Sequence, residues 1–424
     1  MIQEARQYRT GLAVIGSGLA GFAASVFALQ RGIRTAQVGN TGAIAYTTGY
    51  LDLLGWHGDR LLDNPWSGLA TLRQEEPDHP LSRISDQDIR DAFFGFTQAL
   101  SEMGVDYTPP GDRNLLGLTP AGTRKPTLCM PRTMVAGIAA AAAGDRTLIL
   151  DIAGLDGFSA RELVANAGAS WPNLRSRRII FPGVDAGVRV FPEVMARALE
   201  APAHRQQLAG IIRSVAGDAK YIGLPAILGI HRPDRVHRDL ERLTGFTLFE
   251  IPTMPPAVPG IRLREMFEQA FPARGLTLVP QQKVKSLELG KTTARLHLND
   301  SYGKVEIEAE TVILATGRFL SGGLAADRHR VRETLLGIPV SQPESRDHWY
   351  REDYFDLRGH PINRCGIRVD EAFRPISESG RPISERLFAA GILLGGQDWI
   401  RQRCGAGVAI ASAYRAVSFA AGCL

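Results

Sequence analysis

Cysteine is scarce in this chain, and no two cysteines lie close together. The 424 residues include only four, Cys129, Cys365, Cys404 and Cys423. Residues so far apart form neither a C-x-x-C zinc motif nor a run of iron–sulfur ligands. Four dispersed cysteines in a chain of this length are typical of a reducing cytoplasm. We therefore expect no metal site and no iron–sulfur cluster in this chain, and a cytoplasmic location.

The chain also lacks a long hydrophobic run. Residues 136–144 are apolar but too few to cross a bilayer, and the apolar C-terminal stretch carries Arg415 in its middle. Residues 12–29 are apolar enough to suggest a secretory signal, but no small-residue cleavage site follows them. These absences predict that the chain itself is not a membrane protein.

A strong excess of charge of one sign is absent too. The net charge of +5 is small for 424 residues, and lysine and arginine are scattered. The densest basic run, residues 175–178, has no interleaved aromatic side chain, which favours a solvated loop over a nucleic-acid surface. Hydrophobic and charged contents of 44% and 22% indicate a globular chain, long enough for two domains. We expect no nucleic-acid partner.

What the sequence does contain begins between Thr10 and Val38. Residues 12–15 predict a buried parallel strand, residues 19–31 a helix and residues 35–38 a second strand. Between the first strand and the helix lie Gly16, Ser17, Gly18, Leu19, Ala20 and Gly21. A G-x-G-x-x-G turn in a strand–helix–strand unit predicts a dinucleotide-binding site, with a phosphate on the positive end of the helix.

One part of this fingerprint is missing. Gly16 permits the tight turn, Gly18 lets backbone N–H groups approach a phosphate, and Gly21 lets the helix pack closely. A carboxylate usually follows about 20 residues later and binds the ribose hydroxyls of adenosine. Here the second strand ends in residues 37–40 without one. Either the adenosine is held in another way, or the cofactor is a mononucleotide.

A loop rich in glycine and threonine follows the second strand over residues 39–55. Such a composition suits backbone that approaches a flat ligand, and Thr47 and Thr48 offer hydroxyl groups beside Gly49. Its place directly after the second strand favours a cofactor loop over a plain surface loop.

Further elements are predicted along the chain. The expected helices are 86–103, 136–143, 192–199, 233–243, 261–271 and 407–421. The expected strands are 147–152, 188–191, 276–280, 284–289, 294–298, 311–317 and 387–391. The prolines between 252 and 260 exclude a helix or central strand there and favour a stiff linker.

Three separated segments point to one site. They are the Gly16 turn, the strand that ends in Ala315, Thr316 and Gly317, and the strand with glycines at 387–396. This set resembles the two-dinucleotide-domain flavoproteins, in which the second and third segments lie beside the first under the flavin. The resemblance implies an α/β fold, a Rossmann-like doubly wound flavin-binding domain with an inserted α+β cap domain. The expected flavin-binding parts are 1–58, 258–325 and 376–424, the cap or substrate domain is 59–257, and a second cap excursion is 326–375.

The C-terminal run from Ala390 to Ala413 is more specific. It resembles the C-terminal signature of the B subunit of anaerobic glycerol-3-phosphate dehydrogenase, and residues 243–263 and 46–54 resemble that family's linker and post-strand loop. The resemblance covers the chain from the first strand to the C-terminus, although residues 56–221 match only loosely.

This resemblance implies a flavin cofactor, with FMN favoured and FAD as the alternative. It implies two partners, a sister subunit that contains FAD and an iron–sulfur subunit that anchors the complex at the inner face of the cell membrane. It further implies a small anionic substrate, glycerol 3-phosphate, which is oxidised to dihydroxyacetone phosphate with electrons passed to quinone. The missing ribose carboxylate and the missing cluster cysteines fit this scheme.

The C-terminal segment also supplies candidate site residues. We expect Gly391, Gly395, Gly396 and Asp398 near the flavin, with Asp398 accepting a hydrogen bond from a ribityl hydroxyl. The N–H groups of Gly405 to Gly407 precede the last helix and could face the pyrimidine edge, where negative charge develops on reduction. Arg401 and Arg403 are candidates for binding the substrate anion, because arginine binds phosphate bidentately; a solvated pair is the alternative.

Oxidation of a secondary alcohol needs a base for the hydroxyl proton. His57, just beyond the glycine-rich loop, is the candidate, against an ordinary surface histidine. The sequence thus predicts a flavin-dependent subunit of a respiratory glycerol-3-phosphate dehydrogenase. Two alternatives stay open: a self-sufficient flavoprotein oxidoreductase of the fumarate-reductase type, and a non-catalytic subunit that relays electrons.

Overall fold

A computed structural model describes residues 6–39, 43–185 and 187–424. The chain divides into two compact units. The first unit contains Met1–Ala43, Asp52–Ala99 and Phe267–Leu424, and the second contains Ile44–Leu51 and Leu100–Met266. Each unit is therefore built from segments that are distant in sequence.

The first unit is organised around a sheet of seven strands among the described residues. The strands are β1 (Arg6–Ile15), β2 (Thr35–Gly39), β11 (Thr277–Pro280), β12 (Ser286–Leu289), β13 (Ala294–Asp300), β14 (Gly303–Leu314) and β19 (Leu387–Ala389). Their order is β11-β2-β1-β14-β13-β12, and β19 also pairs with β14. β11, β2, β1, β14 and β19 run parallel, whereas β12 and β13 form an antiparallel hairpin.

The long strand β14 has two different partners along one edge. Its first part pairs with β13, from Gly303 to Ala309, and its last part pairs with β19, from Val312 to Leu314. On the opposite edge β14 runs beside β1, with Leu314 opposite Ile15. The carboxyl ends of β1, β14 and β19 therefore meet at one end of the sheet.

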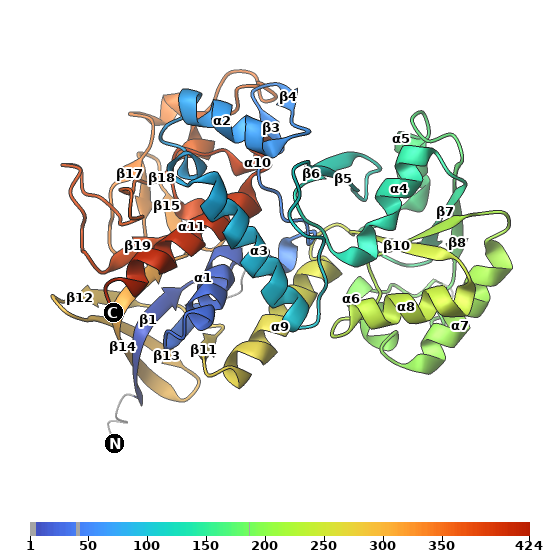
Figure 1. Cartoon of the computed structure of the whole chain (residues 1–424), viewed down its shortest axis with the longest axis horizontal. Helices are drawn as coiled ribbons and strands as arrows, with labels where there is room; N and C mark the ends of the chain where they lie inside the picture. Colours follow the sequence, from blue (N-terminus) through green and yellow to red (C-terminus); the bar gives the residue numbers. More distant parts are fainter. Residues whose placement is uncertain (1–5, 40–42, 186) are drawn as a thin grey trace. The chain divides into compact units, whose positions relative to one another are not determined.

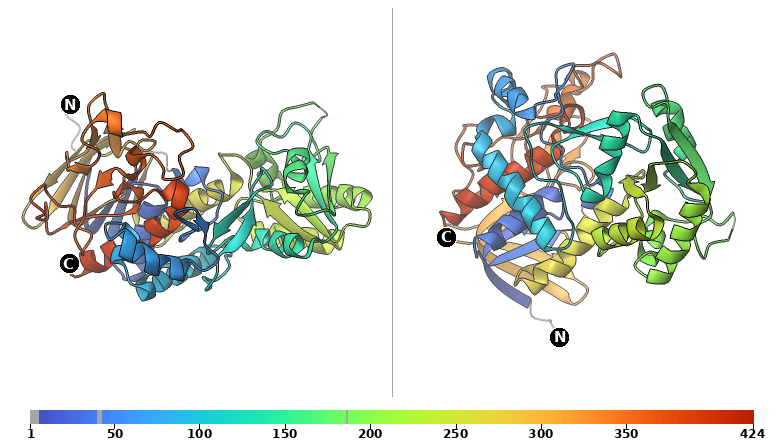
Figure 2. Two further views of the ribbon diagram at one scale, coloured as in Figure 1. Left: turned by 90° about the horizontal axis from the view of Figure 1, so that it is seen from above. Right: turned by 45° about the vertical axis from the view of Figure 1, so that its right-hand side comes forward.

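The helices of this unit include two that lie side by side beside the sheet, α1 (Leu19–Gln30) and α11 (Gly405–Ala421) (Figures 1 and 2). The ring of Phe22 in α1 stacks on Phe267 with centroids 4.7 Å apart, and Phe27 meets Tyr414 of α11 edge-on at 5.2 Å. The other helices and short strands are α2 (Pro65–Glu75), α3 (Asp86–Glu102), the end of α9 (Val258–Ala273), α10 (Trp399–Gln402), β3 (Trp56–His57), β4 (Arg60–Leu61), β15 (Leu324–Ala326), β16 (Val331–Glu333), β17 (Val340–Ser341) and β18 (Gly366–Ile367). The short 3-10 helices are η2 (Pro80–Arg83), η4 (Arg346–His348), η5 (Pro361–Arg364) and η6 (Gly391–Leu393).

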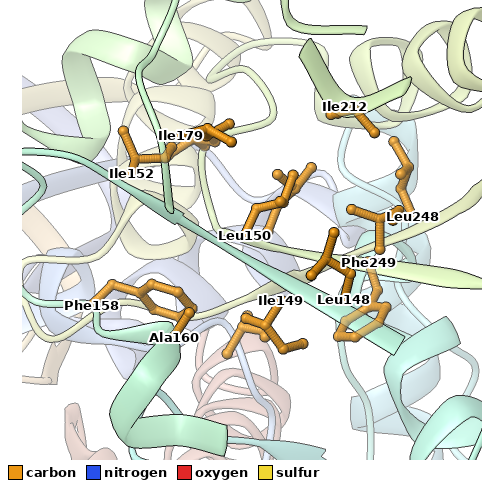
Figure 3. Packing of buried hydrophobic residues seen from close by; sticks show 14 of the residues in the cluster. Leu148, Ile149, Leu150, Ile152, Phe158, Ala160, Ile179, Ile212, Leu248 and Phe249 are labelled. Atoms are coloured by element: carbon orange, nitrogen blue, oxygen red, sulfur yellow. The ribbon is translucent and has the colours of Figure 1, made fainter. Parts of the chain in front are cut away.

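The second unit has a sheet of its own, with the order β10-β9-β7-β8 and every pairing parallel. Its strands are β5 (Leu115–Leu118), β6 (Arg124–Thr127), β7 (Thr147–Ile152), β8 (Leu174–Ile179), β9 (Tyr221–Pro225) and β10 (Thr247–Ile251). Its helices are η1 (Ala43–Tyr46), η3 (Arg132–Met134), α4 (Ala136–Ala143), α5 (Ala160–Ala167), α6 (Pro192–Ala198), α7 (Pro202–Val215), α8 (Pro233–Thr244) and the start of α9. Figure 3 shows the core around β7, where Ile179 and Ile212 lie on one side of the strand and Phe158 and Ala160 on the other.

A buried ion pair ties three elements of the second unit together. Arg262 of α9 donates two hydrogen bonds of 2.7 Å to the carboxylate of Glu250 in β10, and its Nε donates to the carbonyl of Gly229 at 2.7 Å. The same carboxylate accepts from the Thr133 hydroxyl and the Leu228 N–H, both at 2.7 Å. Both charged side chains are almost fully buried, at 2% and 0% exposed. In such a pair each buried charge is compensated by the other and by hydrogen bonds, as long as both partners are present.

The division into units corrects the expected boundaries. Residues 59–99 and 326–375, which we expected in the cap, belong to the first unit, because α2 and α3 pack with the flavin-fingerprint half of the chain. Residues 44–51 and 258–266 belong instead to the second unit. The inserted unit also differs from the expected α+β arrangement, since its main sheet is entirely parallel and only β5 and β6 form an antiparallel hairpin among the residues described there.

Three local predictions were also wrong. Residues 188–191 form no strand, and only Val190 makes an isolated bridge, to Leu155. The basic run at 175–178 is not a loop but part of the edge strand β8, whose exposed positions carry the charges. The proline-rich stretch 252–260 is helical from Val258 onward, because a proline is tolerated in the first turn of a helix. The other expected elements are confirmed; most ends differ by a few residues, but β1 begins at Arg6 and β14 at Gly303, well before the expected starts at 12 and 311.

Candidate active site

The glycine-rich turn lies directly against the end of β14. Gly16 has a φ of +136°, and a Cβ at this position would overlap the carbonyl oxygen of Ala315. The N–H of Ala315 donates to the carbonyl of Ile15 at 2.8 Å. The first two predicted segments are therefore in contact, and only glycine allows the two backbones to approach this closely.

Helix α1 starts at this turn with an open N-terminus. Its N-cap is Gly18, no side chain caps it, and no acidic residue lies in its first turn among the described residues. A Cβ on Gly18 would meet nothing within 4 Å, so there is room in front of the first helical N–H groups. An open, uncapped helix N-terminus is a ready anion site.

Buried polar side chains hold the turn in place. Gln37 of β2 is fully buried; its Nε2 donates to the carbonyl of Gly16 at 2.8 Å, and its Oε1 accepts from the Ser25 hydroxyl at 2.9 Å. A Cβ on Gly39 would lie 2.5 Å from the Ser17 side chain, so a carboxylate-bearing residue could not occupy that position without a shift. Asn40, the next residue of the gap noted in the sequence, lies outside the described residues.

The segment after β14 contributes a buried hydroxyl group that is available for a hydrogen bond to a ligand. Thr316 Oγ1 is buried and makes no hydrogen bond among the described residues. Gly317 has a φ of +68° and packs against the Ser321 side chain. Next to it, the buried guanidinium of Arg318 donates to the carbonyls of Asn363 and Ile362, which fixes this corner to η5.

The third predicted segment also reaches the fingerprint. Gly391, directly after β19, has a φ of +80°, and a Cβ there would lie 2.6 Å from Cβ of Ala20 in α1. Its N–H donates to the hydroxyl of Ser412 in α11 at 2.8 Å. The structure thus brings the fingerprint, the end of β14 and the start of the C-terminal segment together around the N-terminus of α1 and beside α11.

Gly395, Gly396 and Asp398 lie further along the same segment. The N–H groups of Gly395 and Gly396 donate to the carbonyls of Ile367 and Arg364 at 3.0 and 2.9 Å. Asp398 is 3% exposed and is the N-cap of α10, where it accepts from the Arg401 N–H, and its other oxygen accepts from Asn363 Nδ2 at 3.2 Å. The structure therefore gives Asp398 a capping role, and the expected bond to a ribityl hydroxyl remains a prediction.

The N-terminus of α11 is only partly free. Of the three N–H groups expected to face the flavin, that of Gly407 donates to the carbonyl of Asp52 at 2.6 Å. A Cβ on Gly407 would lie 2.6 Å from the carbonyl oxygen of Leu53, so this glycine serves close packing. Gly405 and Ala406 remain the candidates for donation to a ligand.

The candidate catalytic residues lie near this helix end. His57 Nε2 lies 2.7 Å from Glu75 Oε2, and its Nδ1 is buried without a hydrogen-bond partner among the described residues. Arg401 Nε lies 3.7 Å from Asp398. Arg403 is exposed and has a φ of +49°, a conformation that is rare for non-glycine residues and concentrates at functional sites. Strand β3 packs against α10, so all three residues belong to one region of the first unit.

Thr47, Thr48 and Gly49 belong to the second unit. The Thr47 hydroxyl accepts from the Gly49 N–H at 3.2 Å, and the Thr48 hydroxyl accepts from the Tyr50 N–H at 3.4 Å. These bonds shape a tight turn. A role of this loop in cofactor binding stays a prediction.

The relatives of this chain decide its family. The model of the family described as FAD binding domain matches residues 11–408. The B subunit of the anaerobic glycerol-3-phosphate dehydrogenase of Aliivibrio fischeri is 29% identical over 429 residues, which cover 95% of this chain and 93% of that protein. The same subunit of Vibrio cholerae is 30% identical over 421 residues, covering 96% and 95%.

The chain belongs to the B subunit family of anaerobic glycerol-3-phosphate dehydrogenases. It is a flavin-binding oxidoreductase subunit with an FAD binding domain. Among solved structures, the 3-ketosteroid Δ1-dehydrogenase of Sterolibacterium denitrificans aligns with a TM-score of 0.44 at 13% identity, over 98% of this chain and 100% of that chain, a likeness too low to bear on function.

The residues of this dehydrogenase subunit fit a bound flavin nucleotide. The open start of α1 at Gly18 accommodates a phosphate, and the unpartnered Thr316 hydroxyl needs a polar neighbour that the described residues do not supply. The N–H groups at the start of α11 add a second positive helix end. The preference for FMN expected from the sequence receives no support, because the matching family is one of FAD binding domains.

Sequence reasoning missed a partly buried polar cluster in this dehydrogenase subunit. Glu76 accepts two bonds from Arg364, at 2.6 and 3.3 Å, and lies 3.2 Å from the amide nitrogen of Gln402. Gln402 Oε1 in turn accepts from the Asp398 N–H at 2.9 Å. Burial raises the pKa of Glu76, but the Arg364 guanidinium outweighs it and lowers the pKa overall. The cluster thus holds α10, which leads into α11, against α2 and η5.

His79 is the fully buried member of this cluster. Its Nδ1 accepts from the Leu81 N–H at 3.1 Å, so the neutral ring carries its proton on Nε2, which lies 3.9 Å from Cys404 Sγ at the start of α11. Burial lowers the pKa of His79 to about 4, although the charge of Glu76 opposes the shift. Glu76 and Gln402 are 326 residues apart, and no local pattern in the sequence relates them.

The lowered pKa of His79 predicts a loss of stability in acid. The folded value of about 4 lies below the ordinary 6.5, so the unfolded chain binds the proton first. The contribution of neutral His79 to the free energy of unfolding is fully present above pH 6.5. It is lost as the pH falls toward 4, by roughly 3 kcal/mol in total. Urea unfolding of the wild type and of His79→Asn, which keeps an acceptor for the Leu81 N–H, should show this slope only in the wild type. Equal slopes in both proteins would contradict the prediction.

The described residues contain neither a membrane-spanning helix nor a metal cluster. None of the helices there combines the length and the hydropathy needed to cross a bilayer. In the same part of the chain, His, Cys, Asp and Glu side chains form no group of three or more placed to hold a metal ion.

Proposed function

We propose that this chain is the flavin-bound subunit of a respiratory glycerol-3-phosphate dehydrogenase. The observation that carries the proposal is 29–30% identity to the B subunits of such enzymes over almost the full length of both proteins. The oxidation converts the secondary alcohol of glycerol 3-phosphate to the ketone of dihydroxyacetone phosphate, and releases two electrons and two protons. A bound flavin supplies the two-electron acceptor for this step.

The proposed cofactor is FAD, with FMN as the alternative. The family model favours FAD, whereas the absence of a carboxylate at the end of β2 and the backbone packing of Gly39 on Ser17 keep FMN open. In either case Gly18 and the first N–H groups of α1 hold phosphate, and Thr316 Oγ1 bonds a polar atom of the cofactor. Gly405 and Ala406 direct their N–H groups toward the flavin edge that gains negative charge.

We assign the substrate roles to Arg401, Arg403 and His57. The two arginines bind the phosphate of glycerol 3-phosphate, because guanidinium groups match phosphate oxygens bidentately. His57 takes the hydroxyl proton through Nδ1, since Glu75 occupies its Nε2 at 2.7 Å and orients the ring. Nδ1 is buried in the structure, so it must become accessible for this role.

The proposed complex has two further members. A sister subunit with FAD forms the catalytic dimer, and an iron–sulfur subunit receives the electrons, passes them to quinone and holds the complex at the inner face of the cell membrane. The relatives are named as one lettered subunit of their enzyme, which supports an assembly of several different chains. The proposed location is therefore cytoplasmic and peripheral to the membrane.

Two measurements test the proposal: the mass of the bound flavin and its reduction by glycerol 3-phosphate. The chain is purified under conditions that retain cofactor, and the released flavin is weighed; we expect the mass of FAD. Glycerol 3-phosphate, added without oxygen, is expected to bleach the flavin absorbance, while glycerol alone is not, because glycerol lacks the anion that the arginines bind. A chain without any flavin would contradict the whole scheme, and the mass of FMN would contradict only the cofactor assignment.

A second candidate function is electron relay without substrate oxidation. The observation that favours it is the environment of His57: its Nε2 contacts Glu75, and its Nδ1 is buried, so neither nitrogen is open to a substrate. Under this alternative the isolated chain stays oxidised with glycerol 3-phosphate, and its flavin is reduced only after the sister subunit is added.

A further inference from the structure

The residues 350–360, named here the Tyr354 loop, expose an unusual amount of apolar surface in the first unit. Tyr354, Phe355 and Leu357 are 76%, 78% and 77% exposed, and Tyr350 is 58% exposed. Single exposed apolar residues are normal, but here four large ones lie within eight positions, and the rings of Tyr354 and Phe355 meet edge-on with centroids 5.0 Å apart. Such a concentration of exposed apolar side chains marks an interaction site.

Hydrogen bonds within the Tyr354 loop hold its backbone in one conformation. His360 ties it across its base: Nδ1 accepts from the Arg351 N–H at 3.1 Å, and Nε2 donates to the carbonyl of Tyr354 at 3.0 Å. Arg351 Nε donates to the carbonyl of Gly359 at 2.9 Å, and the carbonyl of the buried Trp349 accepts from the Ile362 N–H at 3.1 Å. These hydrogen bonds restrain the backbone that carries the exposed apolar side chains. The loop therefore loses less conformational entropy when a partner binds it.

The loop adjoins the candidate active site. Gly359 has a φ of +74°, and a Cβ there would lie 2.7 Å from Asp398 Oδ2 and 2.8 Å from Arg401 Cδ. A partner bound at the Tyr354 loop would therefore sit beside the segment that leads into α11.

The charges around the loop favour a protein over a lipid surface. Residues 346–358 hold four carboxylates and three arginines. The carboxylate of Asp356 is paired with Arg358 at 2.6 Å, and Glu352 and Asp353 are exposed. Anionic membranes attract basic segments, not a slightly acidic one. Arg346 and Arg358 are exposed as well, so the apolar centre has a border of mixed charge with a slight excess of carboxylates, which fits an apolar recess with a polar rim on a protein.

We propose that the Tyr354 loop inserts into such a recess on the sister subunit of the complex. This inference rests on the proposed function, which supplies that subunit. Permanent interfaces are large and apolar at their centre, whereas transient electron-transfer contacts are small; the apolar loop therefore fits the lasting partner better than the iron–sulfur subunit.

The test measures the affinity of the purified, flavin-loaded chain for the sister subunit. The double variant Phe355→Ser, Leu357→Ser removes two apolar tips and leaves Tyr354, Tyr350 and the His360 frame intact. We expect its Kd to rise at least tenfold, because central apolar residues dominate binding. Tyr302→Ser, a matched control for a side chain that is 75% exposed in the turn between β13 and β14, should stay within twofold. Equal flavin content and thermal midpoint in all three proteins show that the fold is intact.

The outcomes separate this inference from the proposed function. An unchanged Kd in the double variant overturns the inference alone, whereas a wild-type chain that does not bind the sister subunit overturns the complex as well. If the double variant loses binding only to the iron–sulfur subunit, or only to vesicles of phosphatidylglycerol and phosphatidylethanolamine, the loop contacts that partner instead, and the inference is overturned. Sedimentation that shows a wild-type dimer of this chain, dissociated by the double variant, also overturns it.

Discussion

Replacing Gly18 by alanine is expected to remove the flavin and leave the fold intact. The backbone of Gly18, at φ −87°, is open to any residue, and a Cβ would meet no protein atom within 4 Å. The methyl group would instead occupy the space in front of the α1 N-terminus where a phosphate approaches. We expect the Kd for flavin to rise at least tenfold, measured by fluorescence titration of the apoprotein, with a loss of only about 1 kcal/mol in unfolding free energy.

Two further glycine variants sharpen this test. Gly210→Ala, in the middle of α7 with open space around it, should leave flavin binding unchanged and stabilise the chain by about 0.5–1 kcal/mol. Gly16→Ala should lose both flavin and fold, because its Cβ overlaps Ala315 and its φ is +136°. Retention of flavin by the Gly18 variant would place the phosphate somewhere other than the start of α1.

Replacing Arg262 by methionine is expected to cause a large loss of stability. The carboxylate of Glu250 is fully buried and would lose its only charged partner among the described residues, while the bonds from Thr133 and Leu228 remain. Removing one member of a buried pair typically costs about 3–5 kcal/mol. Urea unfolding at pH 7 measures this loss. Arg197→Met, which breaks the ion pairs of a 44% exposed arginine with Glu193 and Glu265, is the control and should cost about 1 kcal/mol or less.

The pH dependence of this variant has a definite sign. Burial raises the pKa of Glu250, but the charge of Arg262 outweighs it, so the folded value lies below the ordinary 4.5. In the wild type the pair therefore stabilises the fold above pH 4.5, and this contribution is lost as the pH falls further. Without Arg262, burial is opposed only by the hydrogen bonds from Thr133 and Leu228, and we expect the pKa of Glu250 to rise, so the difference in unfolding free energy between variant and wild type should narrow in acid. A second change, Glu250→Gln, should recover part of the loss at pH 7 for the same reason; no recovery would contradict the electrostatic account.

The sequence was informative where one local pattern determines the structure. The resemblance to flavoproteins implied that the end of β14 lies beside the fingerprint. The run of Gly16, Gly18 and Gly21 between apolar segments predicted β1, α1 and β2, and the apolar run before Ala315 predicted the end of β14 itself. Both follow from parallel strands with buried faces, whose near-continuous apolar runs are visible without any partner.

Elements without such a pattern were missed. Strand β8 is exposed at all four central positions, 175–178, so it carries no alternation to detect. The chain parts 59–99 and 326–375 were assigned to the cap because they interrupt the Rossmann pattern, but sequence order does not decide which core a segment packs against. Pro259 was read as excluding a helix, although it lies in the first turn of one.

The site shows the same limit. Asp398 was expected to face a sugar, and the four-residue helix α10 that it caps is too short to predict from periodicity. Glu76, His79, Arg364 and Gln402 become neighbours only through folding, and each alone is an ordinary polar residue. Contacts between such distant residues depend on tertiary packing, which one sequence without relatives does not encode locally.

The shared edge of β14 has a consequence for when the cofactor can be loaded. The end of β14 is synthesised more than seventy residues before β19, which pairs with it, and α11, which packs on α1, follows β19 in the chain. Before β19 and α11 are made, the edge at Val312–Leu314 has no strand beside it, and Gly391 and Ser412 are absent from the candidate cofactor site. We therefore expect nascent chains stalled before residue 387 to bind chaperones through this open edge and to take up no flavin.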